Sequence, residues 1–260
     1  MQAAASSRRL ARNVSVGNDT LAVLRAGTDS GWGVAIVCGA GINCVGVAPD
    51  GRLARFPALG WITGDWGGGY DVGLAAVSAA ARSEDGRGPK TTLEHAVPAH
   101  FGLNAPTELA EAFHHGEIQE RRIIELAPVV VAEAANDETA ASIVARLAEE
   151  VVTMIRVALE RLELQDAEAE VVLGGGLMQS GDRRLISAVA SGLQELAHTA
   201  TVKVTSSPPV VGAALLGLDE LGTGPEAQRR AREELANAFT RIEIQKTNPG
   251  PRERSGRRGR

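Results

Sequence analysis

Residues 169–176, AEVVLGGG, decide the fold class of this chain. A short apolar run leads directly into three consecutive glycines, and helical periodicity follows over residues 182–198. Because glycine lets a chain turn sharply, this stretch predicts a strand, a tight turn and a helix in succession. A strand over 202–205, a proline-rich stop at 207–209 and an Ala- and Gly-rich helix over 210–221 repeat the alternation. Such alternation predicts parallel strands with helical crossovers, and hence an α/β layer.

The sequence upstream of this unit predicts the rest of the layer. Residues 31–56 are β-rich and contain a Pro-Asp-Gly turn at 49–51, which indicates two or three antiparallel strands. Apolar residues recur at helical spacing over 140–162, so the longest helix is expected there, capped by Asp137 or Thr139. The sheet is therefore expected to be mixed, with helices on its flanks.

Local patterns predict the structure of several connecting segments. Residues 13–16 alternate with period two and are expected to form a strand. Residues 59–70 hold five glycines and are expected to form a loop. Pro128 is expected to break a helix over 117–127, because proline lacks the amide hydrogen that a helix interior needs. Residues 225–240 are expected to form an amphipathic helix.

Composition limits the classes of function that the chain can have. It has 260 residues, 44% of them hydrophobic, and a formal net charge of −5. This charge argues against general nucleic-acid binding, and no apolar run approaches the ~20 residues of a membrane span. No GxxxxGK[ST] sequence occurs, so a Walker-type phosphate loop is excluded. Two cysteines make no disulfide framework, and a reducing cytoplasm is the expected location.

Glycine clusters that follow predicted strands are the candidate ligand-binding elements. Backbone amides in such turns can approach a phosphate closely, because no Cβ atom intervenes. The first cluster fails the Rossmann fingerprint, since Cys44 stands where the third glycine belongs. Each cluster alone is equally consistent with a structural turn. The clusters are Gly39-Ala40-Gly41, the loop over 60–69, and Gly174-Gly175-Gly176.

Two carboxylates and two cysteines are singled out by their context. Asp19 stands at the start of a helix over 20–26, where it either caps the helix or faces a substrate hydroxyl. Asp65 lies within the glycine-rich loop and either closes an Asx turn or contacts a substrate. Cys38 and Cys44 alternate with apolar residues and are expected to pack in the core.

Six motifs along the chain occur in a specific order. They are VGND (16–19), CGAGINCVG (38–46), LGWITGDWGGGYDVG (59–73), FGL (101–103), VVLGGGL (171–177) and PPVVGAALLGL (208–218). This series resembles the BadF/BadG/BcrA/BcrD ATPase family, which includes N-acetylglucosamine kinase and belongs to the sugar kinase/Hsp70/actin superfamily. The resemblance spans about residues 13–221. It implies an RNase H-like α/β lobe of the actin/Hsp70/sugar-kinase type, with a mixed sheet and flanking helices.

The resemblance also implies a domain organisation. Residues 1–12 form a disordered start, 13–30 a remnant of lobe I with the interlobe connection, 31–222 the kinase lobe II, and 223–260 a C-terminal helix with a disordered basic tail. Members of the family open with an Asp-Gly-Gly-Gly-Thr hairpin, the first phosphate loop, and no such sequence stands upstream of Asn13. We therefore expect lobe I to be truncated and the chain as written to be inactive.

The function implied by the resemblance is ATP-dependent phosphorylation of a sugar or amino sugar. ATP and Mg²⁺ are the implied cofactors, a small sugar is the implied partner, and a homodimer is compatible with the resemblance. Asp19 matches the general base, and no residue matches a metal ligand. Gly39, Ala40 and Gly41 match the second phosphate loop; Gly174, Gly175 and Gly176 match the adenosine motif; and Asn43, Gly60, Trp61 and Asp65 match the positions around the sugar.

Several residues depart from the family pattern and leave alternatives open. Ala40 replaces the usual threonine of the second phosphate loop, Ile42 stands where serine is common, and GDWGGGYD replaces GDEGS beside the sugar. One alternative is an ATPase activator whose iron–sulfur cluster is held by Cys38 and Cys44. The other is a fragment or binding module with no catalytic activity.

Overall fold

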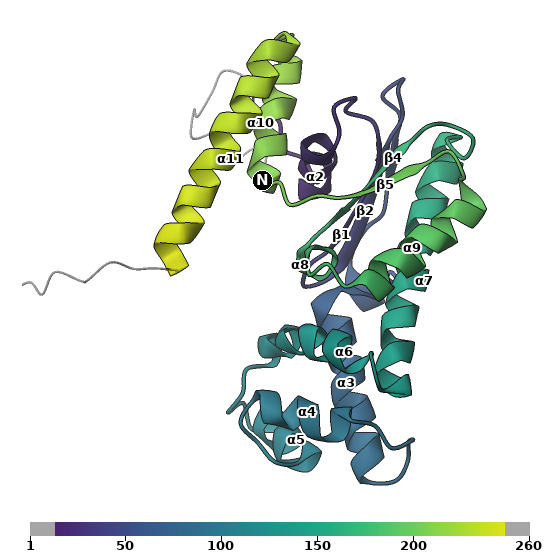
Figure 1. The fold of residues 1–260 in the computed structure, drawn as a ribbon, viewed down its shortest axis with the longest axis vertical. Helices are drawn as coiled ribbons and strands as arrows, with labels where there is room; N and C mark the ends of the chain where they lie inside the picture. Colours follow the sequence, from purple (N-terminus) through teal and green to yellow (C-terminus); the bar gives the residue numbers. More distant parts are fainter. Residues whose placement is uncertain (1–13, 248–260) are drawn as a thin grey trace, which may run out of the picture.

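The computed structural model describes residues 14–247 and is built around a five-stranded mixed sheet (Figure 1). The spatial order of the strands is β3-β2-β1-β4-β5. β1, β2 and β3 pair antiparallel, whereas β4 and β5 extend the sheet parallel to β1. This mixed pairing confirms the expected α/β class. The strands are β1 (Gly33–Cys38), β2 (Ile42–Val47), β3 (Leu53–Arg55), β4 (Glu170–Gly174) and β5 (Thr201–Val204).

Helices cover both faces of the sheet because its central strands are apolar on both sides. Ile36 belongs to the larger core cluster, into which α7 (Glu138–Leu162) packs. Its neighbour Ala35 points to the opposite face, which α2 (Asp19–Gly27) covers. The helix α9 (Arg183–Leu196) packs alongside α7 on the first face (Figure 1). The predicted helices over 140–162 and 182–198 are thus confirmed.

Two further helices form a layer outside α2. They are α10 (Pro209–Glu220) and α11 (Pro225–Thr247), which lie side by side in Figure 1. Gly212 allows α10 to approach α2 closely, since a Cβ atom there would lie 1.7 Å from the Ala22 carbonyl oxygen. The amphipathic helix expected over 225–240 is confirmed within the longer α11.

A group of helices inserted between β3 and α7 forms the lower part of the molecule in Figure 1. This group carries one wall of the candidate site described below. Its members are α3 (Gly68–Glu84), α4 (Leu93–His100), α5 (Pro106–His114), the 3-10 helix η2 (Glu120–Leu126) and α6 (Ala127–Glu133). Within residues 14–247, no helix is both long and apolar enough to cross a bilayer.

The structure corrects three of the local expectations. No strand forms at 13–16: residues 14–18 have no regular secondary structure, and Asn13 lies outside the described residues. Pro128 does not break a helix over 117–127: residues 120–126 form the 3-10 helix η2, and α6 begins at Ala127 with Pro128 in its first turn, where no amide hydrogen is needed. The stretch 59–70 is a loop only in part, since it holds the 3-10 turn η1 (Gly60–Ile62) and α3 begins at Gly68.

The expected disorder of residues 1–12 and of the basic tail falls on residues outside the described range, apart from the helical stretch up to Thr247.

Asp137 caps α7, as expected, by accepting a hydrogen bond from the Ala140 amide at 2.7 Å. The Pro-Asp-Gly turn joins β2 to β3 and is closed by the Gly51 amide, which donates to the Ala48 carbonyl.

Candidate functional site

Two of the glycine clusters meet at the carboxyl edge of the parallel strands β1 and β4. Gly39 follows β1 and Gly175 follows β4, and the parallel pairing brings these ends together. Gly175 has a φ of +90°, and a Cβ atom there would lie 2.3 Å from the Cys38 carbonyl oxygen. Only glycine fits this position without strain. The turn after β4 therefore lies directly against the end of β1.

The third cluster reaches the same place through the first turn of α3. The Gly69 amide donates to the Gly39 carbonyl at 2.8 Å, and the Tyr70 amide donates to the Ala40 carbonyl at 2.9 Å. Gly68, at a φ of +74°, approaches the hairpin tip so closely that a Cβ atom would clash with backbone. The amides at the start of α3 thus hold the tip of the β1–β2 hairpin in place.

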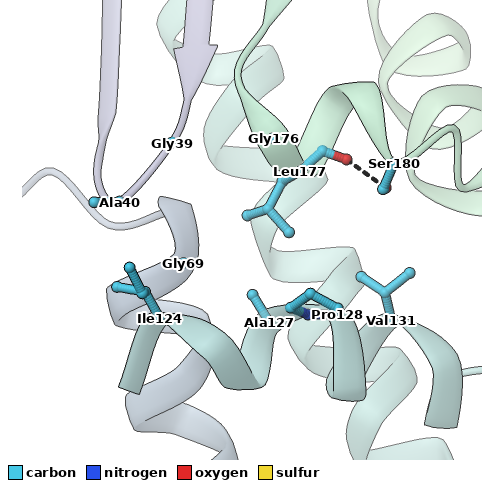
Figure 2. A pocket seen from close by; sticks show the side chains of 10 residues that line it. All are labelled: Gly39, Ala40, Gly69, Ile124, Ala127, Pro128, Val131, Gly176, Leu177 and Ser180. Atoms are coloured by element: carbon cyan, nitrogen blue, oxygen red, sulfur yellow. Dashed lines mark hydrogen bonds between the residues drawn. The ribbon is translucent and has the colours of Figure 1, made fainter. Parts of the chain in front are cut away.

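A pocket of about 240 Å³ opens between this hairpin tip, the short helix α8 (Gly176–Gln179) and the η2–α6 segment (Figure 2). Leu177 forms one side, and Ala127, Pro128 and Val131 form the other. The complete lining is Gly39, Ala40, Gly69, Ile124, Ala127, Pro128, Val131, Gly176, Leu177 and Ser180. The walls are almost entirely apolar, while backbone from two glycine turns borders the space.

The wall from η2 and α6 is the part of the site that sequence reasoning missed. Ile124, Ala127, Pro128 and Val131 recur at steps of three and four residues, which is the spacing of one helix face. That spacing was available from the sequence, but it equally marks a face buried in the core. Only the fold shows that this face borders an open pocket.

The glycines of the site divide into two kinds. A Cβ atom at Gly39, Gly41 or Gly176 would have no neighbouring atom within 4 Å, so these positions face open space. Gly68 and Gly175 instead require glycine because of positive φ and close backbone contact. The open glycines are therefore the ones at which a side chain would obstruct a ligand without disturbing the fold.

Asp19 is the first residue of α2 and its side chain is exposed. It does not cap the helix: Asn18 does, because its Oδ1 accepts a hydrogen bond from the Thr20 amide at 3.0 Å. The same oxygen accepts a hydrogen bond from the Asn43 Nδ2 at 3.0 Å. Asn43 thus ties the start of α2 to β2, and the Asp19 carboxylate is left facing outward.

Asp19 borders a second cavity rather than the first. This cavity has a volume of about 740 Å³ and lies between residues 15–22 and α10, where Val210 and Ala213 also line it. The contact between Asn18 and Asn43 places Asp19 at the same edge of the sheet as the hairpin tip, because Asn43 lies two residues beyond Gly41. The predicted base and the glycine turns thus share one edge of the sheet but line different cavities.

The remaining predicted sugar-side residues lie in the loop around η1 and line neither cavity. Trp61 is 87% exposed. The Asp65 amide donates to the Gly60 carbonyl at 3.0 Å, and the Asp65 carboxylate accepts a hydrogen bond from the Thr63 hydroxyl. The structure therefore gives Asp65 a turn-closing contact and leaves its proposed substrate contact as a prediction.

Both cysteines are buried in the core, as predicted from their alternation with apolar residues. Burial raises the pKa of the Cys38 thiol to about 12, and burial together with the nearby Cys38 raises the pKa of Cys44 as well. A cluster shared between two subunits needs thiolates at a surface. The burial of these thiols argues against the iron–sulfur alternative.

Comparison with known proteins identifies relatives of this chain. An N-acetylmuramic acid/N-acetylglucosamine kinase of Clostridium acetobutylicum is 30% identical over 168 residues, covering 64% of this chain and 55% of the relative. An N-acetyl-D-glucosamine kinase of Dictyostelium discoideum is 27% identical over 212 residues, covering 80% and 66% respectively. The chain therefore spans between just over half and about two-thirds of the length of these relatives.

Solved structures show the same fold. A protein of Chromobacterium violaceum assigned as an N-acetylglucosamine kinase superposes with a TM-score of 0.62 at 23% identity, over 83% of this chain and 70% of that protein. A similarly assigned protein of Porphyromonas gingivalis superposes with a TM-score of 0.54 at 18% identity, over 75% of this chain and 63% of that protein. The model of the BadF/BadG/BcrA/BcrD ATPase family matches residues 2–217. With its motifs in the family's order and its glycine turns gathered at one sheet edge, this chain belongs to the BadF/BadG/BcrA/BcrD ATPase family.

Proposed function

We propose that this chain is the nucleotide-binding lobe of an ATP-dependent kinase that phosphorylates an amino sugar of the N-acetylglucosamine type. The observation that carries the proposal is the convergence of the Gly39–Gly41 tip and the Gly176 turn on one apolar pocket. Apolar walls bordered by backbone amides suit a nucleotide, whose base is flat and whose phosphates are anionic. The names of the relatives supply the acceptor class.

In this proposal the adenine ring occupies the pocket and the phosphates extend along the hairpin tip. The pocket, at about 240 Å³, lies below the ~300–1,000 Å³ of sites that enclose whole drug-sized ligands, which suits one ring system. Ala40 stands where the family usually has threonine, so no side-chain hydroxyl is available here. Among the described residues the Ala40 amide donates to no acceptor, which leaves it free for a phosphate oxygen.

Asp19 is the proposed general base. The sugar hydroxyl oxygen would attack the γ-phosphorus, the bond from that phosphorus to the β–γ bridging oxygen would break, and the hydroxyl proton would pass to Asp19. ADP is the leaving group. General-base catalysis of this kind contributes typically ~10²–10⁴-fold to the rate. The exposed position of Asp19, with its neighbours Asn18 and Asn43 bonded to each other, leaves the carboxylate available to an acceptor.

The pocket itself does not form a magnesium site. None of its ten lining residues is a carboxylate, and no group of three His, Cys, Asp or Glu side chains within residues 14–247 could hold a metal ion. Magnesium in nucleotide sites is commonly held by substrate phosphates and one or two carboxylates. Mg²⁺ would therefore enter with ATP, and the residues described here supply amides and a base.

The proposal is tested in two steps. Calorimetric titration of the chain with ADP is expected to show one binding site, and absence of binding would overturn the proposal. ATP-dependent phosphorylation of N-acetylglucosamine, N-acetylmuramic acid and glucose is then measured with the chain and with a form extended by the codons upstream of Met1. Asp19→Asn is expected to keep ADP affinity and to lower turnover ~10²–10⁴-fold in whichever form is active. Unchanged turnover would remove Asp19 from the role of base.

A further inference from the structure

The nucleotide pocket offers almost no side-chain hydrogen-bonding group. Of its ten lining residues, nine have aliphatic side chains or are glycine, and only Ser180 carries a polar group. The Ser180 hydroxyl donates to the Leu177 carbonyl at 2.6 Å, so its hydrogen is directed into the α8 turn. Figure 2 shows this bond, with the Leu177 side chain directed toward the wall formed by Ala127 and Pro128. No charged or amide side chain borders the space.

The backbone groups around the pocket are largely occupied by bonds within the protein. The Gly39 amide donates to the Gly41 carbonyl, and the Gly39 carbonyl accepts a bond from Gly69. The Ala40 carbonyl accepts a bond from Tyr70, and the Gly176 carbonyl accepts one from the Ser180 amide. Pro128 has no amide hydrogen at all. Three lining residues, Ala40, Gly176 and Leu177, have amides with no acceptor among the described residues, and all three lie in the turns that follow β1 and β4. The opposite wall, from η2 and α6, offers a ring only apolar contact.

We infer that this pocket contacts the two faces of a purine ring and forms no selective hydrogen bonds with its edge. Nucleotides of adenine, guanine and hypoxanthine therefore bind with similar affinity. The inference rests on the proposed function and deepens it, since it defines the donor class as purine nucleotides in general. Sites that hydrogen-bond a substrate group reject analogues by ~10⁴–10⁵-fold, whereas apolar pockets discriminate by only ~10–200-fold. The bases differ at edge groups for which the lining supplies no charged or amide side chain.

Ring size is the one property that such a pocket distinguishes. A pyrimidine covers less of the apolar wall formed by Leu177, Ala127 and Val131 than a purine does. Because the free energy of apolar burial scales with area, cytosine and uracil nucleotides are expected to bind about tenfold more weakly than purine nucleotides.

The test is competition for a fluorescent nucleotide on the full chain. N-methylanthraniloyl-ADP is bound first and then displaced by ADP, GDP, IDP and CDP. The three purine diphosphates are expected to have dissociation constants within about tenfold of one another. A dissociation constant for GDP or IDP more than a hundredfold above that of ADP would overturn the inference while leaving the proposed function intact. If neither the probe nor unlabelled ADP binds, the proposed function itself fails.

Two variants separate face recognition from edge recognition. Ser180→Ala removes the one polar side chain and is expected to leave the ratio of ADP to GDP affinity unchanged, because that hydroxyl bonds within α8. A change in this ratio of tenfold or more would show that Ser180 reads the base and would contradict the inference. Gly176→Val narrows the pocket and is expected to lower the affinity for all purine nucleotides by a similar factor.

Discussion

Each of the three consecutive glycines after β4 has a different environment. A Cβ atom at Gly174 would lie 2.9 Å from a methyl of Val23, and one at Gly175 would lie 2.3 Å from the Cys38 carbonyl oxygen. A Cβ atom at Gly176 would meet nothing within 4 Å. The sequence shows three identical residues, so it cannot distinguish the glycine that packs against α2 from the one that shapes a turn or the one that opens a pocket.

This difference predicts opposite phenotypes for neighbouring substitutions. Gly176→Val is expected to lower ADP affinity at least tenfold without changing stability, because the new side chain enters the pocket. Gly175→Ala is expected to destabilise the fold by ~1–3 kcal/mol, because a positive φ and a backbone clash are imposed together. Calorimetric titration measures the ADP affinity, and urea unfolding measures the stability of the fold. Loss of stability in Gly176→Val would show that this glycine is structural.

The cysteines give a second prediction at the residue scale. Burial holds the pKa of Cys38 near 12 and raises the pKa of Cys44, so both thiols stay protonated well above neutral pH. Because only the thiolate reacts with disulfide reagents, the native protein is expected to release no colour from Ellman's reagent at pH 8. Two thiols per chain should react in guanidinium chloride. Rapid reaction of a native thiol would revive a role for these cysteines in cluster binding.

At the scale of elements, one glycine controls how α10 attaches to the rest of the molecule. Gly212→Ala would place a methyl group 1.7 Å from the Ala22 carbonyl of α2, so the helices must separate. We expect a loss of ~1–3 kcal/mol of stability, the usual cost of overpacking. Gly217→Ala in the same helix meets nothing within 4 Å and is expected to stabilise by up to ~1 kcal/mol. Urea unfolding measures the stability of both variants. Equal changes in the free energy of unfolding would show that the contact between Gly212 and Ala22 does not hold α10 in place.

A single carboxylate joins α4 to α7. Asp137 accepts hydrogen bonds from the Ala140 amide that it caps, from the Thr91 hydroxyl and from the Thr92 amide. Burial of the carboxyl favours its neutral form, but these bonds outweigh burial and hold the pKa of Asp137 below its usual value. The bonded carboxylate therefore stabilises the fold above the unfolded pKa of about 3.9, and this stability is lost as pH falls through the lowered folded pKa.

Two substitutions of Asp137 are expected to behave differently. Asp137→Ala removes the cap and the link to α4, and is expected to cost about 2 kcal/mol at pH 7. Asp137→Asn keeps a capping oxygen but cannot titrate, so its stability should change less between pH 7 and pH 3 than that of the unchanged protein. Urea unfolding at both pH values measures this. A wild-type and an Asn variant with parallel pH profiles would contradict the assigned role of the charge.

The elements that the sequence predicted best are those whose signals are local. The helix α7 follows from its apolar spacing and the Asp137 cap, and the turn after β2 follows from Pro-Asp-Gly. The strand expected over 13–16 failed because a strand depends on a hydrogen-bonded neighbour, and its own alternation says nothing about whether one is present. Pro128 misled because proline stops a helix interior but is compatible with a helix start.

At the scale of the whole molecule, the pocket is made by segments far apart in the sequence. The hairpin tip at 39–40, the η2–α6 wall at 124–131 and the α8 turn at 176–180 meet only in the folded chain. The sequence motifs identified the first and third of these segments as glycine turns after strands. They could not identify the wall, because an apolar helix face has the same pattern whether it borders core or cavity. They also could not show that Asp19 and the glycine turns line separate cavities.

Because the pocket bridges the sheet and the inserted helices, a nucleotide bound there contacts both parts and should stabilise the molecule as a whole. A ligand that binds only the folded state stabilises it by about 2.7 kcal/mol at a concentration a hundred times its dissociation constant. For a chain of this size, each added kcal/mol of stability raises the melting temperature by ~2–4 °C. ADP at a hundred times its dissociation constant should therefore raise it by roughly 5–10 °C. Thermal unfolding followed by fluorescence measures the shift, with Gly176→Val as the matched control because Gly176 lines the pocket and a Cβ atom there meets nothing within 4 Å. A shift of equal size in that variant would mean that ADP stabilises the protein from a different site, and the pocket would then lose its assignment.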